Sequence, residues 1–138
     1  MTDLLKAIRE ERQAVNATPS DHPDRATSLN NLGAFACLRY ARTGVISDIE
    51  EATRVARRAV DVTPRDYRDQ ATRLGNLGIC IRKRYARAGV KADIDEAITI
   101  VRQAIHATPP DHPNRPRRLC NLGHRLGDRY IDIPRPLY

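Results

Sequence analysis

The triplet Asn31-Leu32-Gly33 recurs as Asn76-Leu77-Gly78 and again as Asn121-Leu122-Gly123. The difference in position between successive copies is 45 residues both times. A fixed interval of about 20–50 residues is the sequence signature of a solenoid, in which each unit buries its apolar face by stacking on its neighbours. The triplet therefore predicts a repeat architecture.

Many other residues share this register. A threonine–proline pair, an arginine–tyrosine pair and spaced alanines recur at the same positions of each unit. Chance does not produce so many coincidences, so we interpret the chain as copies of one unit. The recurring residues are Thr18-Pro19, Thr63-Pro64 and Thr108-Pro109, then Arg39-Tyr40, Arg84-Tyr85 and Arg129-Tyr130, and Ala14, Ala59 and Ala104.

The first half of each unit predicts a helix. It begins near Asp21-His22-Pro23, because proline suits the opening turn of a helix, where its missing N–H has no partner. It ends near Gly44, where glycine adopts the left-handed conformation of a C-cap. Apolar residues recur between these points at helical spacing. They are Leu29, Leu32, Ala36 and Tyr40, matched in the next unit by Leu74, Leu77, Ile81 and Tyr85.

The second half predicts a helix with small residues on its apolar stripe. We expect it to begin with a capping box, Ser47–Glu50 in one unit and Asp93–Glu96 in the next. Pro64 follows its end because proline cannot continue a helix. Alanine lets two helices approach at the short end of the usual range of about 8–10 Å. The stripe consists of Ile49, Ala52, Ala56, Ala59 and Val60.

Glycine recurs in the middle of the first helix, at Gly33, Gly78 and Gly123. Glycine at such a position costs roughly 0.5–1 kcal/mol relative to alanine. We therefore expect a compensating gain, which is the close passage of the partner helix. The prediction is a packing glycine and not a phosphate-binding loop.

The chain is therefore predicted to be all-α, a single α-solenoid of antiparallel helix pairs over residues 1–138. With a repeat of 45 residues it holds about two and a half to three units. It opens with one helix of the second type and closes with one of the first type. The expected helices are approximately 3–17, 23–42, 47–62, 68–87, 92–107 and 113–131, followed by an irregular tail at 132–138.

One unit resembles the tetratricopeptide repeat (TPR), which has Leu-Gly in its first helix and spaced alanines and a closing proline in its second. The ordinary unit of that family has about 34 residues. The longer unit is similar to the kinesin-light-chain-like subclass, as found in fungal and actinobacterial arrays beside CHAT protease or NB-ARC nucleotide-binding modules. The resemblance implies a superhelix that binds protein in a concave groove lined by its first helices. The residues that carry it are Asp21-His22-Pro23-Asp24-Arg25, Leu29, Leu32-Gly33, Gly44, Ala52, Ala59 and Pro64.

An asparagine precedes each Leu-Gly pair, inside a helix, where asparagine has poor intrinsic propensity. In the resembled family this residue projects toward the groove. A carboxamide offers donors and an acceptor, so a column of asparagines would bind the main chain of an extended peptide. The alternative is that each amide bonds a neighbouring helix and fixes repeat packing. The predicted peptide-binding residues are Asn31, Asn76 and Asn121, with Arg117 and His124 adding positive charge near the C-terminal end.

The chain has a formal net charge of +7, and its basic residues are almost all arginine. The planar fork of arginine suits carboxylate and phosphate partners, so acidic peptides and nucleic acid are both candidate ligands. A solvated helix surface is the alternative. Single-stranded nucleic acid normally stacks on aromatic side chains. One phenylalanine and five tyrosines offer few platforms, so nucleic acid is the weaker candidate.

The residues that carry chemistry are scattered. His22 and His112 share a register but lie two repeats apart, which separates them by roughly 20 Å or more if helices are spaced at 8–10 Å. Cys37, Cys80 and Cys120 fit no zinc-binding spacing. We therefore expect no enzyme activity, no metal and no cofactor. The odd number of thiols and the lack of an 18-residue apolar run favour a cytoplasmic protein without a disulfide framework or a membrane span.

These observations predict a non-catalytic scaffold that binds an extended or acidic peptide in its groove. The alternative is an assembly or regulatory segment of a larger protease or signalling protein, which acts through the open solenoid ends. No polar capping helix is evident at either end, although terminal repeats usually carry one. We therefore expect a fragment of a longer array, or a chain that associates with another copy or partner through Leu4, Ile8 or the C-terminal tail.

Overall fold

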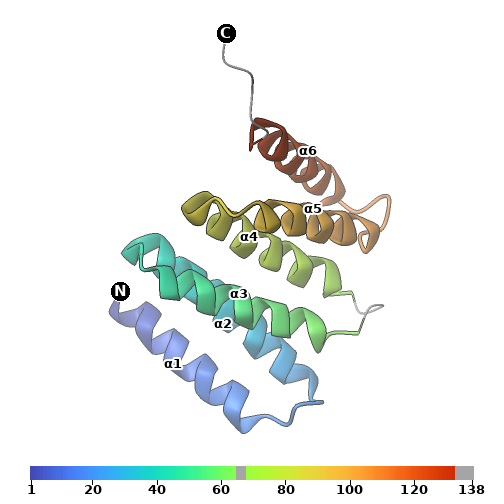
Figure 1. Ribbon diagram of the computed structural model, residues 1–138. Coiled ribbons are helices and arrows are strands. Elements are labelled where there is room, and N and C mark those ends of the chain that lie inside the picture. Colours follow the sequence, from blue (N-terminus) through green and yellow to red (C-terminus); the bar gives the residue numbers. More distant parts are fainter. Residues whose placement is uncertain (65–67, 133–138) are drawn as a thin grey trace.

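The computed structural model describes residues 1–64 and 68–132 (Figure 1). This part of the chain is helical and has no strand, which confirms the all-α class. Each helix end lies within two residues of the position expected from the sequence. Of the expected tail, residue 132 ends the last helix, and residues 133–138 lie outside the described part. The helices are α1 (Thr2–Ala17), α2 (Pro23–Thr43), α3 (Ile46–Asp61), α4 (Gln70–Ala88), α5 (Lys91–His106) and α6 (Arg115–Asp132).

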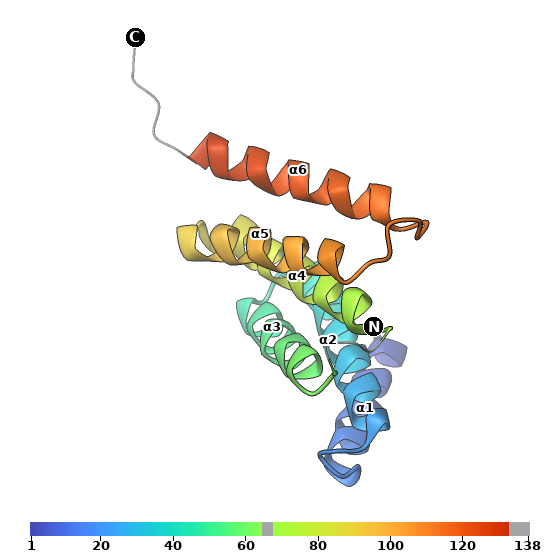
Figure 2. The ribbon, with the colours of Figure 1, turned by 90° about the vertical axis from the view of Figure 1, so that its right-hand side faces the viewer.

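The helices form one stack, with α1 and α6 at opposite ends in both views (Figure 1, Figure 2). Consecutive helices run in opposite directions, and each packs on the helices next to it in sequence. Contact is most extensive between α2 and α3 and between α4 and α5. Helix α2 also packs against α4. The arrangement agrees with the expected solenoid of helix pairs.

Left-handed glycines end α2 and α4, as the sequence predicts. Gly44 has a φ of 66° and Gly89 a φ of 69°. The backbone N–H of Gly44 donates to the Tyr40 carbonyl at 2.8 Å, and that of Gly89 donates to the Tyr85 carbonyl at 2.7 Å. Glycine takes this conformation without the penalty that a side chain would add. Both helices therefore stop at the same register position.

The Asp-His-Pro turn starts a helix by side-chain capping. Nδ1 of His22 accepts a hydrogen bond from the backbone N–H of Asp24 at 3.1 Å, and Nδ1 of His112 accepts one from Asn114 at 3.0 Å. These bonds satisfy backbone donors that a helix start leaves free. The recurrent threonine acts at the end of the preceding helix, where its hydroxyl donates to a carbonyl four residues earlier at 2.6 Å. The pairs are Thr18–Ala14, Thr63–Ala59 and Thr108–Ala104.

The capping boxes predicted for Ser47–Glu50 and Asp93–Glu96 are wrong. Helix α3 begins earlier, at Ile46, and no side chain caps α3 or α5. The aspartate of the first turn has another partner, since Asp48 accepts a hydrogen bond from the hydroxyl of Thr43 at 2.7 Å. The glutamates of the expected boxes pair with arginines of other helices. Tertiary ion pairs thus replace the local cap.

The apolar stripes meet in a core that runs along the stack. Helix α1 contributes to it, because Ile8 is 3% exposed and Leu4 packs against the same cluster as Leu29 and Leu32. Leu4 and Ile8 are therefore core contacts between α1 and α2, which corrects their expected role at an open end. The outer side of α1 carries Glu10, in the register where α3 and α5 bury an apolar residue.

The three mid-helix glycines have different surroundings. A Cβ added to Gly33 would lie 3.3 Å from the backbone nitrogen of Ala56, so α2 and α3 pass closely there. A Cβ on Gly78 would lie 3.5 Å from Cγ2 of Ile100, which is ordinary contact. Gly123 has nothing within 4 Å of such an atom. The predicted close passage is confirmed at Gly33, is looser at Gly78, and does not occur at Gly123 within the described chain.

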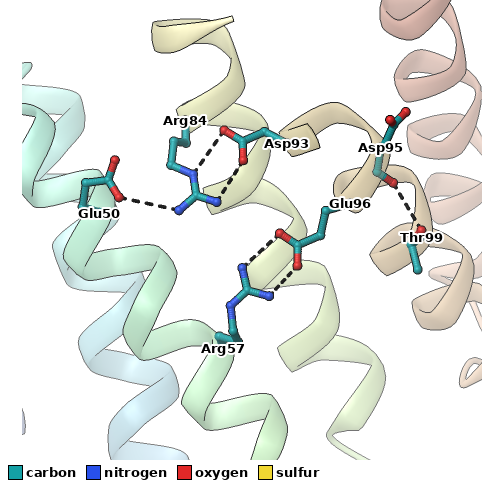
Figure 3. Close-up of polar contacts among 7 residues, drawn as sticks. All are labelled: Glu50, Arg57, Arg84, Asp93, Asp95, Glu96 and Thr99. Atoms are coloured by element: carbon teal, nitrogen blue, oxygen red, sulfur yellow. Dashed lines mark hydrogen bonds and ion pairs between the residues drawn. The ribbon is translucent and has the colours of Figure 1, made fainter. Parts of the chain in front are cut away.

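Ion pairs repeat between units as the apolar contacts do (Figure 3). Arg57 on α3 forms a two-point contact with Glu96 on α5, with Nη2 3.0 Å from Oε1. Arg12 and Glu51 form the same pair one unit earlier, between α1 and α3. Each pair thus joins a helix of the second type to the next one of that type.

Arg84 of α4 joins α3, α4 and α5 (Figure 3). Its guanidinium donates to the carboxylate of Asp93 on α5 at 2.9 and 3.2 Å and lies 3.6 Å from Glu50 on α3. Arg129 on α6 repeats the contact with α3 one unit later, 3.4 Å from Asp95 on α5. Several arginines therefore hold helices together.

The surroundings of Gly33 and Gly123 predict opposite effects on stability when each glycine is replaced by alanine. Gly33→Ala places a methyl group against the backbone of Ala56, and such overpacking costs about 1–3 kcal/mol, more than the roughly 0.5–1 kcal/mol gained from helix propensity. Gly123→Ala meets open space and keeps only the gain. Urea unfolding followed by circular dichroism should show a lower midpoint for Gly33→Ala and an unchanged or higher one for Gly123→Ala. Equal shifts in one direction would contradict the close approach of α2 and α3.

The Arg57–Glu96 pair predicts a pH dependence of stability. Hydrogen bonds from Arg57 lower the pKa of Glu96, although burial acts in the opposite direction. A carboxyl whose pKa is lower in the folded state contributes stability above its unfolded pKa, and this is lost as pH falls through the folded pKa. Below about pH 4.5, the melting temperature of the wild type should fall more steeply than that of Glu96→Gln. Glu10→Gln, at an exposed residue of α1, is the control, and its melting temperature should depend on pH as that of the wild type does.

Candidate binding groove between α4 and α6

A groove of about 580 Å³ lies between α4 and α6, with α5 at its base. Small residues of α4, including Gly75 and Gly78, keep one wall low. Val101 and Ala104 of α5 form the apolar base. Amide and cationic side chains line the rest. They are Asn76 and Arg82 from α4, Asn114 before α6, and Arg117, Arg118, Asn121, His124 and Arg125 from α6.

The groove opens where the repeat changes. Between α2 and α4, Asn76 Nδ2 donates to Asn30 Oδ1 at 2.9 Å. One unit later the residue in the register of Asn30 is Gly75, which has no amide to receive Asn121. The backbones of α2 and α4 approach each other closely, whereas those of α4 and α6 do not. Because Gly75 replaces asparagine in this register, α4 and α6 lack the amide–amide hydrogen bond that joins α2 and α4.

Arg118 bridges the narrow end of the groove. Its Nη1 donates to the carbonyl of Ala71 on α4 at 3.0 Å and lies 2.9 Å from the place of a Cβ on Gly75. A side chain at position 75 would therefore displace this guanidinium. In the preceding unit the same register holds Arg73, which bonds Thr63 at 2.6 Å. The arginine at this position ties α4 and α6 to the unit before each of them.

The guanidinium of Arg118 is buried and incompletely satisfied. The residue is 7% exposed, and its Nε has no hydrogen-bond partner in the described chain. Burial lowers the pKa of Arg118, and the nearby charge of Arg117 lowers it further. Arginine nevertheless stays protonated in proteins. A buried cation without a matching anion is unfavourable, so this position favours an incoming negative group.

The electrostatic character of the groove is positive. Its lining includes Arg82, Arg117, Arg118 and Arg125 and no aspartate or glutamate. Arg125 is neutralised in part by Asp128, which lies 3.0 Å away outside the lining. The remaining three guanidinium groups have no carboxylate partner within the groove. Oriented guanidinium groups bind carboxylates and phosphates through paired N–H donors.

The structure gathers four of the five predicted binding residues in this groove. Asn76, Asn121, Arg117 and His124 line it. Asn31 does not, because it lies on α2 and its Nδ2 is 3.4 Å from Oε1 of Glu11 on α1. The groove is therefore confined to the C-terminal half of the stack.

The three repeated asparagines differ in what their amides contact. Asn31 and Asn76 each donate to a side chain of another helix, which is the packing alternative raised for the sequence pattern. Asn121 is exposed, and its amide bonds no described residue. Among the three, Asn121 has the carboxamide that is available to a ligand.

Two features of the groove were missed from the sequence. Arg82 and Arg125 occupy no recurring polar position, since their registers elsewhere hold cysteine, phenylalanine or glycine. Cys120 Sγ lies 3.8 Å from Nε2 of His124 on the exposed side of α6. The four-residue spacing of Cys120 and His124 was the available signal, because such residues are neighbours on a helix. Residues that differ from the repeat, such as Arg82 and Arg125, therefore distinguish the groove from the rest of the stack.

A pair of thiols lies beside the groove, between α2 and α4. Cys37 is partly buried and packs against the core cluster that contains Cys80. A hydrogen bond from the thiol of Cys80 lowers the pKa of Cys37 to about 7, although burial opposes the shift, and the charges of Lys83 and Arg82 lower it further. Both thiols are free. Cys37 is thus the thiol most readily ionised near neutral pH in this pair, because the pKa of Cys80 is raised.

The pH dependence of alkylation tests this thiol pair. The rate at which iodoacetamide modifies Cys37, followed by peptide mass spectrometry, should rise through about pH 7. Cys80→Ala removes the S–H donor, so the midpoint should move upward toward the ordinary value of 9.0. Lys83→Gln should move it less, since the hydrogen bond is the larger cause. An unchanged midpoint in Cys80→Ala, with native circular dichroism, would contradict the bond.

Neither a model of a known protein family nor a curated protein matches this chain. Among the residues described, none of the helices is long and apolar enough to cross a membrane. Nor do those residues bring together three or more histidine, cysteine, aspartate or glutamate side chains that could hold a metal ion. The basic groove between α4 and α6 is the site whose geometry carries the functional argument.

Proposed function

We propose that the groove between α4 and α6 binds an acidic segment of an extended peptide, and that the chain acts as a non-catalytic protein-interaction scaffold. The observation that carries this proposal is the buried guanidinium of Arg118, whose Nε lacks a hydrogen-bond partner in a groove without carboxylates. A ligand carboxylate would compensate that charge. Arg117 and Arg82, on opposite walls, would hold further acidic side chains.

The shape of the groove supports a peptide ligand. Its volume of about 580 Å³ lies within the range of roughly 300–1,000 Å³ found for ligand sites. The amides of Asn121 and Asn114 offer donors and acceptors to a peptide main chain. The apolar base of Val101 and Ala104 would contact aliphatic parts of the same ligand. Acidic side chains would give affinity, and the amides would orient the backbone.

The same proposal includes a TPR-like array of the long-unit type. It is supported by the 45-residue register, by the close passage at Gly33 and by the stacking of consecutive helices. A groove formed by first-type helices is what the resemblance implies for peptide binding. A regulatory segment of a larger protein is the second candidate, and the exposed face of α6 favours it.

Nucleic acid is a weaker candidate for the groove. Its lining contains no phenylalanine, tyrosine or tryptophan, and single-stranded nucleic acid gains much of its affinity from stacking on aromatic residues. Arginines outside the groove are partly neutralised, as in the pairs Arg57–Glu96 and Arg84–Asp93.

Charge reversal in the groove tests the proposal. The probe is a fluorescein-labelled peptide of six glutamates, and binding is followed by fluorescence anisotropy. Arg117→Glu should weaken binding at least about tenfold, because a hydrogen bond to a charged group contributes about 1.5–3 kcal/mol. Arg54→Glu makes the same charge change on exposed α3 outside the groove, and its affinity should stay within about twofold. Asn121→Ala should weaken binding, whereas Asn31→Ala should not.

Three results would contradict this function. An equal loss of affinity in Arg117→Glu and in Arg54→Glu would show that the peptide is attracted by the net charge of the protein alone. Tighter binding of a single-stranded oligonucleotide, lost in Arg117→Glu, would assign the groove to nucleic acid. An intact affinity in Arg117→Glu, with native circular dichroism, would place the peptide elsewhere.

A further inference from the structure

The last helix carries the same apolar face as α2 and α4, but that face is uncovered. Leu29 and Leu74 are 0% and 4% exposed, whereas Leu119 in the same register is 48% exposed. Leu122 is only partly buried, and a Cβ on Gly123 would meet no atom within 4 Å. Within the described chain, α6 packs on α5 and reaches α4 through the hydrogen bond from Arg118 to Ala71.

The earlier units show what covers this face. Helix α3 lies on α2 and helix α5 lies on α4, and these are the most extensive contacts in the stack (Figure 1). The covering helix places Ala56 against Gly33 in one unit and Ile100 against Gly78 in the other. It also buries Ala52 and Ala97 completely. The face therefore accepts an amphipathic helix with alanines on its inner stripe.

An ion pair also joins the covering helix to the helix that it covers. The covering helix presents an aspartate in its first turn, and Asp93 on α5 bonds Arg84 at 2.9 Å. Arg84 also contacts Glu50, so one guanidinium holds a carboxylate from each neighbouring helix. Arg129 of α6 has the partner that corresponds to Glu50, which is Asp95 at 3.4 Å. Its second partner, in the register of Asp93, would come from a helix that covers α6.

We propose that the uncovered face of α6 binds an amphipathic helix of a partner protein, with an aspartate in its first turn and an alanine and isoleucine stripe like that of α5. Leu119 and Leu122 would contact its apolar stripe, and Arg129 would bond its aspartate. Leu119, Leu122 and Arg129 do not line the groove. The inference therefore does not depend on the proposed peptide ligand.

A second copy of this chain is a poorer occupant. Its α1 would bring Asp3, Leu4 and Ala7 to the matching positions. However, it would also bring Glu10 to the register in which Val55 and Ile100 are buried. Ile100 packs against Gly78, so Glu10 would be buried near Gly123, and an unpaired buried carboxylate is costly. The charge on α1 thus favours a partner helix with an apolar residue at that position.

The test uses a synthetic peptide with the sequence of residues 91–107, labelled with fluorescein, added to the full chain. Fluorescence anisotropy should show saturable binding with one peptide per chain. Leu119→Asp changes an exposed position and should weaken binding at least about tenfold. Leu38→Asp, at a residue 51% exposed on α2, is the matched control and should bind as the wild type does. Neither substitution should alter binding of the glutamate peptide in the groove.

A double-mutant cycle tests the charge contact. Replacing aspartate by asparagine at the position of Asp93 in the peptide should weaken binding to the wild type several-fold. The same change should have little effect on binding to Arg129→Ala. Failure of the peptide to bind, or equal binding by Leu119→Asp, would overturn the proposal. Concentration-dependent self-association in sedimentation velocity, abolished by Leu119→Asp, would also overturn it by assigning the face to a second copy.

Discussion

Each helix of this chain has an apolar face that is buried by the helices next to it in sequence, and the rest of the structure depends on that constraint. At Gly33 the two helices come close enough that a single added carbon would meet the backbone of Ala56. Because burial is passed from neighbour to neighbour, the stack has a direction and no central core. Ion pairs such as Arg57–Glu96 follow the same rule and link one unit to the next. The fold is therefore a sum of similar local interfaces.

Much of this fold could be predicted from the sequence, because the determinants are local and repeated. Gly44 and Gly89 end helices through their own backbone conformation, and the apolar stripes require only helical spacing. The capping boxes failed for a tertiary reason, since Glu50 and Glu96 pair with arginines of other helices, Arg84 and Arg57. The arginine pairs did leave a signal, because Arg12–Glu51 and Arg57–Glu96 have one spacing and one register.

The candidate site could be predicted only in part, because it arises where the repeat is broken. The sequence pointed to Asn76, Asn121, Arg117 and His124, which the groove brings together. It could not separate Asn31, whose amide reaches Glu11 on another helix. Nor does a periodic pattern reveal the role of Gly75. Its lack of a side chain leaves the space that the guanidinium of Arg118, one unit later, occupies. The repeated residues determine the helical stack, whereas residues that differ from the repeat form the groove.

The position of α6 has a thermodynamic consequence. Within the described chain it packs closely on α5 and is joined to α4 by the Arg118–Ala71 hydrogen bond, so its order is maintained by fewer contacts than that of α2 and α4. A terminal helix of a stack opens at a lower free energy than an internal one. One face of α6 lines the groove and another is uncovered, so an occupant of either surface would reduce the population of frayed chains. The two surfaces are then coupled without a change of shape, through the entropy of ordering a shared helix.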